Sequence, residues 1–354
     1  MIDADAADRL ILDESASARA TTPPGAFVVI GDESGALTRA VLGDGAGHVR
    51  VHQDSVTAEW TLRDAVADPD RARSLGLDPA LVTDAGTVLV RLPRSLDALR
   101  DIAGLIAAHA RPDVVVFAGG RIKHMSLTMN DVLREYFTTV DVTHARQKSR
   151  VLIARGPHDG ADPMPRTARH NLPGLSEPIV VSALGGVFAG TSIDIGTRFL
   201  IENLPGRLPE GGDVVDLACG TGVVAVWLAL QHPDITVLAT DRSSAAVTSA
   251  RATAAANGIA ERVQVVRDDG LASRPDGSAA FIALNPPFHE GAAVDERLAF
   301  WLFADAARAL RPGGELWTVW NSPLAYRSAL ERIVGPTRQV ARNAKFTVAA
   351  STRR

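Results

Sequence analysis

The residues best suited to chemistry are Asn285, Pro286, Pro287 and Phe288, which follow an apolar run over Ala279–Leu284. Such a run is typical of a buried strand, and two prolines cannot continue a central strand, so we expect a turn here. The turn would leave an amide side chain and proline carbonyls at the carboxyl edge of the sheet, where open α/β sheets bind ligands. These acceptors, with Phe288 as a ring to stack on, suit a planar amino group. A purely structural turn is the alternative.

A glycine turn upstream favours a ligand site. The apolar residues Val214–Leu217 lead into Ala218–Gly222, and Val223–Gln231 is expected to be a helix. Glycines allow positive φ and close backbone approach, which a nucleotide-like ligand requires. Two more expected strands end in acids, one in Asp241 and one in Asp268-Asp269-Gly270.

These groups all follow strands, so parallel pairing would place them on one rim of one sheet. An acid at the end of the second strand, here Asp241, can accept both ribose hydroxyls. The alternative is a Rossmann-like fold whose glycines serve packing only.

Residues 179–354 resemble class I S-adenosylmethionine-dependent methyltransferases of the "small" type, and more narrowly the ribosomal RNA guanine-N2 methyltransferases. Besides the motifs above, the resemblance is carried by Gly186-Val187-Phe188, Asp194-Ile195-Gly196-Thr197, His289 with Gly291, and Asn343–Val348. It implies methylation of the exocyclic N2 of a guanine in ribosomal RNA, with Asn285–Phe288 as the catalytic residues. A guanine inside a duplex cannot reach such a pocket, so the base must be unpaired or flipped.

The resemblance also implies how S-adenosylmethionine is held. Asp216 and Gly220 would position the methionyl amine, Asp241 the ribose, and Asp269 the adenine amino group, with Asp268 as the alternative. The remaining cofactor-binding residues implied are Ala218, Gly222, Arg242, Gly270, Asn285, Phe188, Gly196 and Thr197. His289 would contact the substrate base, either as a proton acceptor or as a hydrogen-bonding residue that shapes the loop.

The chain reads as two copies of one architecture. Arg111-Pro112 and Arg311-Pro312 each precede a strand, 311 − 111 = 200 residues apart, and later elements repeat at a similar spacing. Near-constant spacing favours duplication. We therefore expect two tandem Rossmann-like α/β methyltransferase domains, over 1–155 and 179–354. The Gly- and Pro-rich residues 156–178 between them read as a linker.

The first copy is expected to be degenerate, as the resemblance also implies. Its glycine turn, Gly31–Gly35, carries Asp32 and Glu33, whose charges would repel a bound carboxylate. Where the second copy has Asn-Pro-Pro-Phe, the first has Val90–Arg94, with neither an amide nor a ring. This domain is expected to bind or orient RNA, through Arg91, Arg94, Lys123 and Lys148. Segments 120–124 and 147–150 look slightly more like the large-subunit enzyme than the small-subunit one.

Composition narrows the remaining classes. The 354 residues include 46% hydrophobic and 22% charged ones, which is ordinary for a globular chain. No apolar run approaches the roughly 20 residues of a membrane span, and the acidic start lacks a signal-peptide pattern. The single cysteine, Cys219, excludes an internal disulfide. We expect a cytoplasmic, monomeric protein without a metal, whose partner is ribosomal RNA or a ribosomal subunit.

Two alternatives stay open from the residues themselves. Asn-Pro-Pro-aromatic turns also serve methyltransferases that act on adenine, cytosine or protein glutamine, although these usually carry Tyr or Trp in the fourth place. The net charge of −4 argues mildly against a nucleic-acid partner, but basic residues cluster in the middle and at the end of the chain. A catalytically silent RNA-binding or ribosome-assembly factor is therefore the second alternative.

Overall fold

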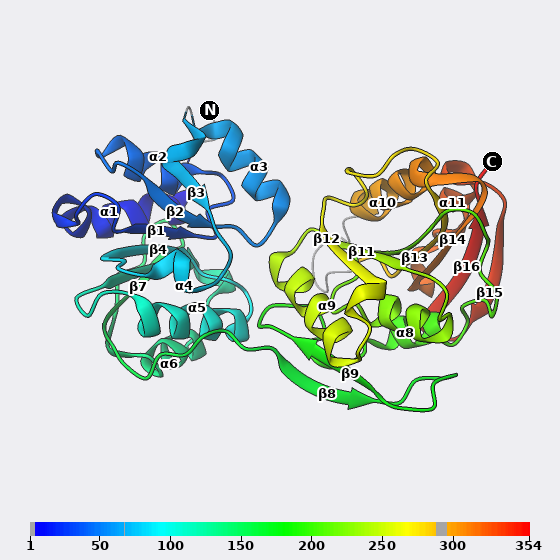
Figure 1. Cartoon of the computed structure of the whole chain (residues 1–354). Coiled ribbons are helices and arrows are strands. Elements are labelled where there is room, and N and C mark those ends of the chain that lie inside the picture. The colour runs from blue at the N-terminus through cyan, green and yellow to red at the C-terminus, as the bar shows by residue number, and fades with distance from the viewer. Residues whose placement is uncertain (1–3, 67, 288–295) are drawn as a thin grey trace. The chain divides into compact units, whose positions relative to one another are not determined.

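A computed structural model describes residues 4–66, 68–287 and 296–354. The chain divides into two compact units (Figure 1). Unit 1 comprises Met1–Met164 with Leu184–Gly186, and unit 2 comprises Pro165–Ala183 with Val187–Arg354.

Unit 1 is built on a seven-stranded sheet of order β3-β2-β1-β4-β5-β7-β6. Its strands are β1 (Phe27–Ile30), β2 (Val49–His52), β3 (Ala72–Ser74), β4 (Thr87–Arg91), β5 (Val115–Arg121), β6 (Phe137–Val142) and β7 (Ser149–Pro157). Its helices are α1 (Ala6–Thr21), α2 (Ala36–Gly43), α3 (Val56–Ala65), α4 (Pro79–Val82), α5 (Leu96–His109) and α6 (Thr128–Arg134), with 3-10 turns η1 (Pro69–Arg71) and η2 (Ile122–His124). The first five strands are parallel, and β7 is antiparallel to both of its neighbours.

Unit 2 repeats this sheet in the order β12-β11-β10-β13-β14-β16-β15. Its strands are β10 (Asp213–Leu217), β11 (Val237–Asp241), β12 (Val263–Arg267), β13 (Ala279–Leu284), β14 (Leu310–Asn321), β15 (Thr337–Arg342) and β16 (Phe346–Thr352). Its helices are α7 (Ile195–Ile201), α8 (Val223–Gln231), α9 (Ser244–Ala256), α10 (Glu296–Ala309) and α11 (Arg327–Ile333), with 3-10 turns η3 (Ala260–Arg262) and η4 (Ser322–Leu324). Again the last strand in the chain, β16, is antiparallel to both neighbours.

Helices cover both faces of each sheet (Figure 1), so that central strands such as β1 and β13 are buried on both sides and apolar throughout. In unit 1 one core joins the sheet to α1, α2 and α3, and the other joins it to α4, α5 and α6. In unit 2 the corresponding cores involve α7, α8 and α9 on one side and α10 and α11 on the other. The expectation of two tandem Rossmann-like domains is confirmed, with the same strand order and helices on both faces of the sheet in each.

The segment expected to be a linker contains regular structure. Strand β7 continues to Pro157, and β8 (Arg166–His170) pairs antiparallel with β9 (Ile179–Ala183) in a separate two-stranded sheet. None of the residues of β8 is buried, so its sequence is polar and shows no alternation of apolar residues that would predict a strand. Within the described ranges, no helix combines the length and apolarity needed to cross a bilayer.

The turn that begins α8 requires glycine at position 222. Gly222 has φ of +74°, and a Cβ built there would lie 2.9 Å from Ala250 Cβ and 3.2 Å from Ala250 Cα. Gly258 has a similar φ of +69° but nothing within 4 Å of the built Cβ. An alanine at position 258 would therefore suffer only backbone strain, whereas an alanine at position 222 would suffer backbone strain and a steric clash.

We predict that Gly258→Ala costs about 1 kcal/mol of unfolding free energy, from positive φ alone. Gly222→Ala should cost about 3 kcal/mol, because a backbone clash adds to the same strain. Urea unfolding followed by tryptophan fluorescence measures both, since Trp227, Trp301, Trp317 and Trp320 all lie in unit 2. Equal costs for the two variants would show that the α8–α9 approach is not tight.

Candidate active site

The glycine turn after β10 contacts the acid at the end of β11. Gly220 N donates to Asp241 Oδ2 at 2.9 Å, and Ser243 N donates to Asp241 Oδ1 at 2.9 Å. A Cβ built on Gly220 would meet nothing within 4 Å, so this part of the turn faces open space. Ala218 adopts φ of +56°, a strained value for a residue with a side chain and one that is typical of functional turns.

Asp216, the last acid of β10, is buried at 3% exposure. Its Oδ2 accepts a hydrogen bond from Ala225 N, in the first turn of α8, at 2.9 Å. Burial, together with the charge of Asp241, raises the pKa of Asp216 to about 7 although the Ala225 amide opposes the shift. A cation placed beside this carboxyl would therefore favour its ionised form.

Cys219 does not have the environment of a nucleophile. Burial, with added repulsion from Asp241 and Asp216, raises the pKa of its thiol well above the ordinary value. The thiolate is the reactive form, so this cysteine is inert at neutral pH. Its place in the tight turn fits a small apolar residue.

The two acids after β12 have different surroundings. Asp268 is buried, and its carboxylate accepts from Asp269 N at 2.9 Å, Ser273 N at 2.9 Å and Ser273 Oγ at 2.7 Å. Those bonds shape the turn, and Asp268 N in turn donates to Asp241 O at 3.0 Å. Asp269 is only half-buried; burial raises the pKa of its carboxyl while the nearby Arg242 opposes that shift. Of the two, Asp269 is the better placed to receive a ligand's amino group.

The side chain of Asn285 is held by the start of α7. Its Nδ2 donates to Thr197 Oγ1 at 2.9 Å and to Asp194 Oδ2 at 3.3 Å. Asp194 is the N-cap of α7 and accepts from Gly196 N at 2.9 Å and Thr197 N at 3.2 Å through the same oxygen. Pro286 is buried and Pro287 is exposed. Asn285 thus sits at the carboxyl end of β13 with its amide group fixed.

The structure brings most of the expected site residues onto the carboxyl edge of β10–β13. Phe288 and His289 lie outside the described residues. Phe188 lies in the loop after β9 and is 66% exposed. Thr197 accepts from Asn285, and Gly196 lies against Asp194, the other partner of Asn285. The sequence had suggested Gly196 and Thr197 only as cofactor-binding residues. Gly270 fits closely against Trp301 and Asp305.

Sequence reasoning missed Asp194 as a partner of Asn285. The available signal was an acid directly before a short apolar helix, which is the pattern of an N-cap. No group of three or more His, Cys, Asp or Glu side chains able to hold a metal occurs in the part of the chain that the structure describes.

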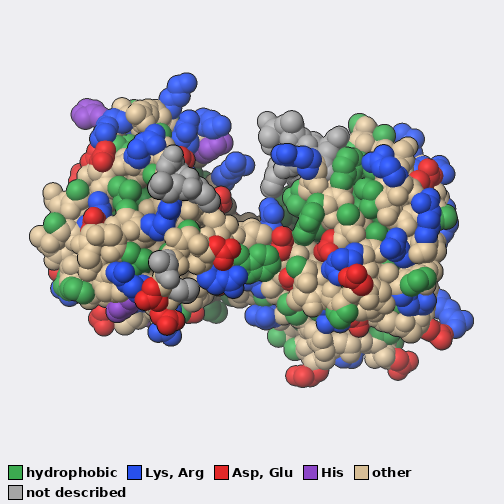
Figure 2. Space-filling model, turned by 90° about the horizontal axis from the view of Figure 1, so that it is seen from above, with side chains coloured by type: hydrophobic (Ala, Val, Ile, Leu, Met, Phe, Trp, Pro, Cys, Tyr) green, Lys and Arg blue, Asp and Glu red, His purple; other side chains and the backbone are tan. Residues whose placement is uncertain are grey.

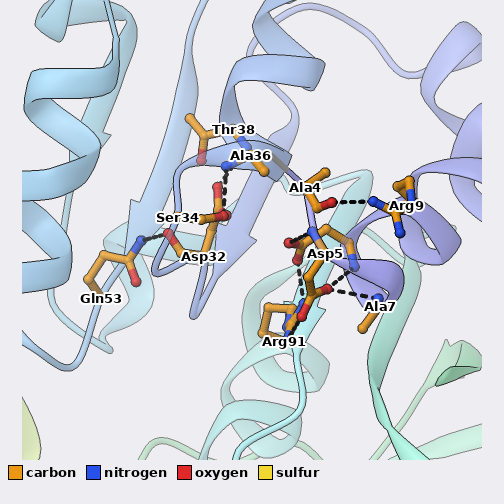
Figure 3. Close-up of polar contacts among 11 residues, drawn as sticks. Ala4, Asp5, Ala7, Arg9, Asp32, Ser34, Ala36, Thr38, Gln53 and Arg91 are labelled. Carbon is orange, nitrogen blue, oxygen red and sulfur yellow. Dashed lines mark hydrogen bonds and ion pairs between the residues drawn. The ribbon is translucent and has the colours of Figure 1, made fainter. Parts of the chain in front are cut away.

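Arg91 of unit 1 is not free to bind substrate, contrary to the expectation from sequence. Its Nη1 donates to Asp5 Oδ1 at 2.8 Å and to Asp8 Oδ1 at 2.5 Å (Figure 3). Asp32 of the first glycine turn is buried, and its Oδ2 accepts from Thr38 N, in the first turn of α2, at 2.8 Å. Because Arg91 is paired within unit 1, we do not retain it as an RNA contact.

The other three basic residues gather around η2. Arg94, Lys123 and Lys148 are exposed, and Ile122 N donates to Lys148 O at 2.9 Å. Desolvation, and then the charges of Lys123, Arg94 and Arg121, lower the pKa of His124, which shows that these groups lie near one another. Leu127, just beyond η2, is 80% exposed. A mixed basic and apolar surface therefore surrounds η2.

Comparisons with known proteins agree with this architecture. Residues 178–350 match the methyltransferase small domain, and residues 3–158 match the RLMG N-terminal domain. A ribosomal RNA large subunit methyltransferase G of Streptomyces avermitilis is 36% identical, with 97% of this chain and 91% of that protein aligned. The protein of the same name from Pseudomonas paraeruginosa is 32% identical, with the same coverage.

A solved structure shares the fold. The T. thermophilus 16S rRNA N2 G1207 methyltransferase in complex with AdoMet and guanosine superposes with a TM-score of 0.78 at 22% identity, covering 99% of this chain and 92% of that one.

The relatives confirm the family expected from the motifs, including the preference for the large-subunit enzyme, and they exclude the alternative of a catalytically silent factor. S-adenosylmethionine is the methyl donor of this class of enzyme. Two domains of matching topology, the carboxyl-edge constellation in unit 2, and relatives aligned over nearly the whole chain lead to one conclusion: the chain belongs to the ribosomal RNA large subunit methyltransferase G family of S-adenosylmethionine-dependent enzymes.

Proposed function

We propose that this enzyme methylates the exocyclic N2 of a guanine in large-subunit ribosomal RNA, with the base unpaired or flipped into a pocket at Asn285. The observation that supports this most strongly is the fixed amide of Asn285. Its NH2 group donates to Thr197 and Asp194, so its carbonyl oxygen, on the opposite side of Cγ, points away from α7. A guanine amino group needs such an acceptor, and a ribosomal RNA substrate would place the protein in the cytoplasm.

The chemistry depends on alignment rather than on a strong base. S-adenosylmethionine supplies an electrophilic methyl group on a sulfonium, and transfer is an in-line displacement that requires orientation and exclusion of water. The lone pair of an exocyclic amine is delocalised into its ring. Acceptors at Asn285 Oδ1 and the Pro286 carbonyl would bind its protons, favour a pyramidal nitrogen and stabilise the charge that develops in the transition state. The proton leaves afterwards, because methylation makes it acidic.

The described residues fit a bound donor. The open space at Gly220 leaves room for the methionyl part, and the buried carboxyl of Asp216 suits its ammonium group. Asp241, half-buried beside the glycine turn, would hold the ribose. Asp269, next to Arg242, would hold the adenine amino group. Asp268 is instead engaged within its own turn.

Unit 1 would hold the RNA. Lys and Arg side chains are spread over the visible face of both units and interspersed with Asp and Glu (Figure 2). A local cluster is therefore needed to attract a phosphate backbone. Arg94, Lys123 and Lys148 around η2 provide one, with exposed Leu127 available to contact a base. We propose that a monomer suffices, with one unit binding RNA and the other transferring the methyl group.

We predict that ribosomal RNA from a deletion strain lacks one N2-methylguanosine, and that wild-type protein restores it. Asn285→Ala should not restore it, because removing a transition-state hydrogen-bond partner lowers turnover by about 10²-fold or more. Its affinity for S-adenosylmethionine, measured by calorimetry, should stay within about twofold of wild type. Mass spectrometry of the purified RNA reads the modification. An unchanged guanine profile with altered methylation of adenine, cytosine or a protein glutamine would refute this assignment.

Cofactor affinity should depend on pH through Asp216. With its pKa at about 7, the carboxyl is mainly protonated at pH 5.5. The donor's ammonium requires the ionised form, so binding releases a proton. The association constant should therefore rise by up to about tenfold per pH unit between pH 5.5 and 6.5, and level off above pH 7.

Calorimetry over this range measures the slope. Asp216→Asn should bind more weakly with a flat pH profile, whereas Asp269→Asn should keep the slope. A wild-type affinity independent of pH from 5.5 to 7 would contradict the role given to Asp216.

Changing Arg94 and Lys123 together to Ala should weaken RNA binding without changing the modified position. Because each side chain is expected to neutralise one phosphate, removing both should make the slope of log K against log salt concentration shallower by about 1.5. Binding titrations at several salt concentrations measure this slope. The matched control is Arg63→Ala with Arg73→Ala, two exposed arginines on α3 and β3. An equal loss in the control pair would deny the η2 cluster any special role.

A further inference from the structure

In both units, two residues at the start of a helix accept hydrogen bonds from the side chain at the end of the same strand, a contact that we call the grip. In unit 2 the N-cap of α7, Asp194, and the residue three positions later, Thr197, accept from Asn285 Nδ2. In unit 1 the N-cap of α1, Asp5, and the residue three positions later, Asp8, accept from Arg91 Nη1 (Figure 3).

Strand register shows that Asn285 and Arg91 are equivalent. Val90 of β4 pairs with Ala118 of β5, and Leu284 of β13 pairs with Thr318 of β14. The partners are 318 − 118 = 200 residues apart, the offset of the duplication. Arg91 and Asn285 are the next residues along these strands. The two units therefore share the grip as part of the duplicated fold. They differ in the donor residue, which is Arg91 in unit 1 and Asn285 in unit 2.

The chemistry of the grip fixes the direction of the amide. A carboxylate only accepts hydrogen bonds, so the amide group that faces Asp194 must be NH2 and not the carbonyl. Nδ2 and Oδ1 lie on opposite sides of Cγ, so the carbonyl oxygen is turned away from α7. In unit 1 the held group is a guanidinium, which has five donors and no acceptor. It cannot accept the protons of an amino group.

We infer that Asp194 and Thr197 are positioning residues that set turnover by orienting the Asn285 amide, and that they are not determinants of donor affinity. The inference rests on the proposed function, because it needs Asn285 to accept from the substrate. Without the grip the amide rotates about Cβ–Cγ, and its NH2 group, which repels an amino donor, can replace the oxygen.

Thr197→Val tests this with little change of shape. Valine keeps the branched side chain and the backbone amide that Asp194 caps, and removes only the hydroxyl acceptor. We expect kcat to fall about tenfold, while KM for RNA and the Kd for S-adenosylmethionine stay within about twofold. Thr197→Ser, which restores the hydroxyl, should recover most of the turnover. Asp194→Ser retains an N-cap but shortens the reach to Asn285, and should show the same separation of kcat from Kd.

The combination with Asn285→Ala separates positioning from a structural role. If Thr197 acts through Asn285, adding Thr197→Val to Asn285→Ala lowers kcat no further. A full additional tenfold loss in the double variant would overturn the inference. So would a donor Kd raised about tenfold in Thr197→Val, since that result makes Thr197 a cofactor contact. Wild-type turnover by Asn285→Ala alone would overturn the proposed function and this inference with it, whereas the other two outcomes leave the proposed function standing.

Discussion

The geometry of each unit's carboxyl edge depends on hydrogen bonds between the end of one strand and the start of one helix. These bonds join β4 to α1 in unit 1, and β13 to α7 in unit 2. In unit 2 a single oxygen, Asp194 Oδ2, accepts two backbone amides of α7 and the side chain of Asn285. The N-terminus of a helix carries unpaired N–H groups and a partial positive charge, so a carboxylate there is stabilised where it stands. That anchored carboxylate dictates which end of the Asn285 amide points away. The orientation of the Asn285 amide is thus set by hydrogen bonds to the capped start of α7.

Duplication explains how the two units came to differ while keeping their fold. Both sheets have the same order, and both glycine turns run from a residue with positive φ to a glycine N-cap with φ of +70° or +74°. The polar groups at the carboxyl edge have changed. Gln53, one residue beyond β2, takes the place of Asp241 and donates to Asp32 O at 2.6 Å, so it binds the turn instead of leaving a carboxylate for a ribose. Arg91 stands where unit 2 has Asn285, and it forms salt bridges with Asp5, the N-cap of α1, and with Asp8 of α1. Unit 1 therefore lacks these acceptors and has internal pairing in their place, and under the proposed function its contact with RNA is assigned to the basic surface around η2.

Much of the fold could be predicted from sequence because strand, glycine turn and helix follow one another with local signals. Val223–Gln231 and Ala279–Leu284 have the bounds that periodicity gave them. The repeat spacing predicted a second sheet of equal topology. Strand β8 could not be foreseen, since Arg166–His170 is polar and pairs only because β9 lies beside it. The sequence predicted Arg91 to contact RNA for a related reason. Sequence alone does not show whether an arginine faces solvent or pairs with an aspartate 83 residues away. Asp194 was visible as a cap, but its bond to a residue 91 positions later depends on the folded sheet.

The most direct test of the account is a crystal structure of the enzyme with S-adenosylhomocysteine and guanosine. We expect the cofactor at the Gly220 turn of unit 2, with Asn285 Oδ1 at about 3 Å from the guanine N2 and Nδ2 still bound to Thr197. A cofactor bound in unit 1, or a guanosine whose amino group meets neither Asn285 nor Pro286, would contradict it.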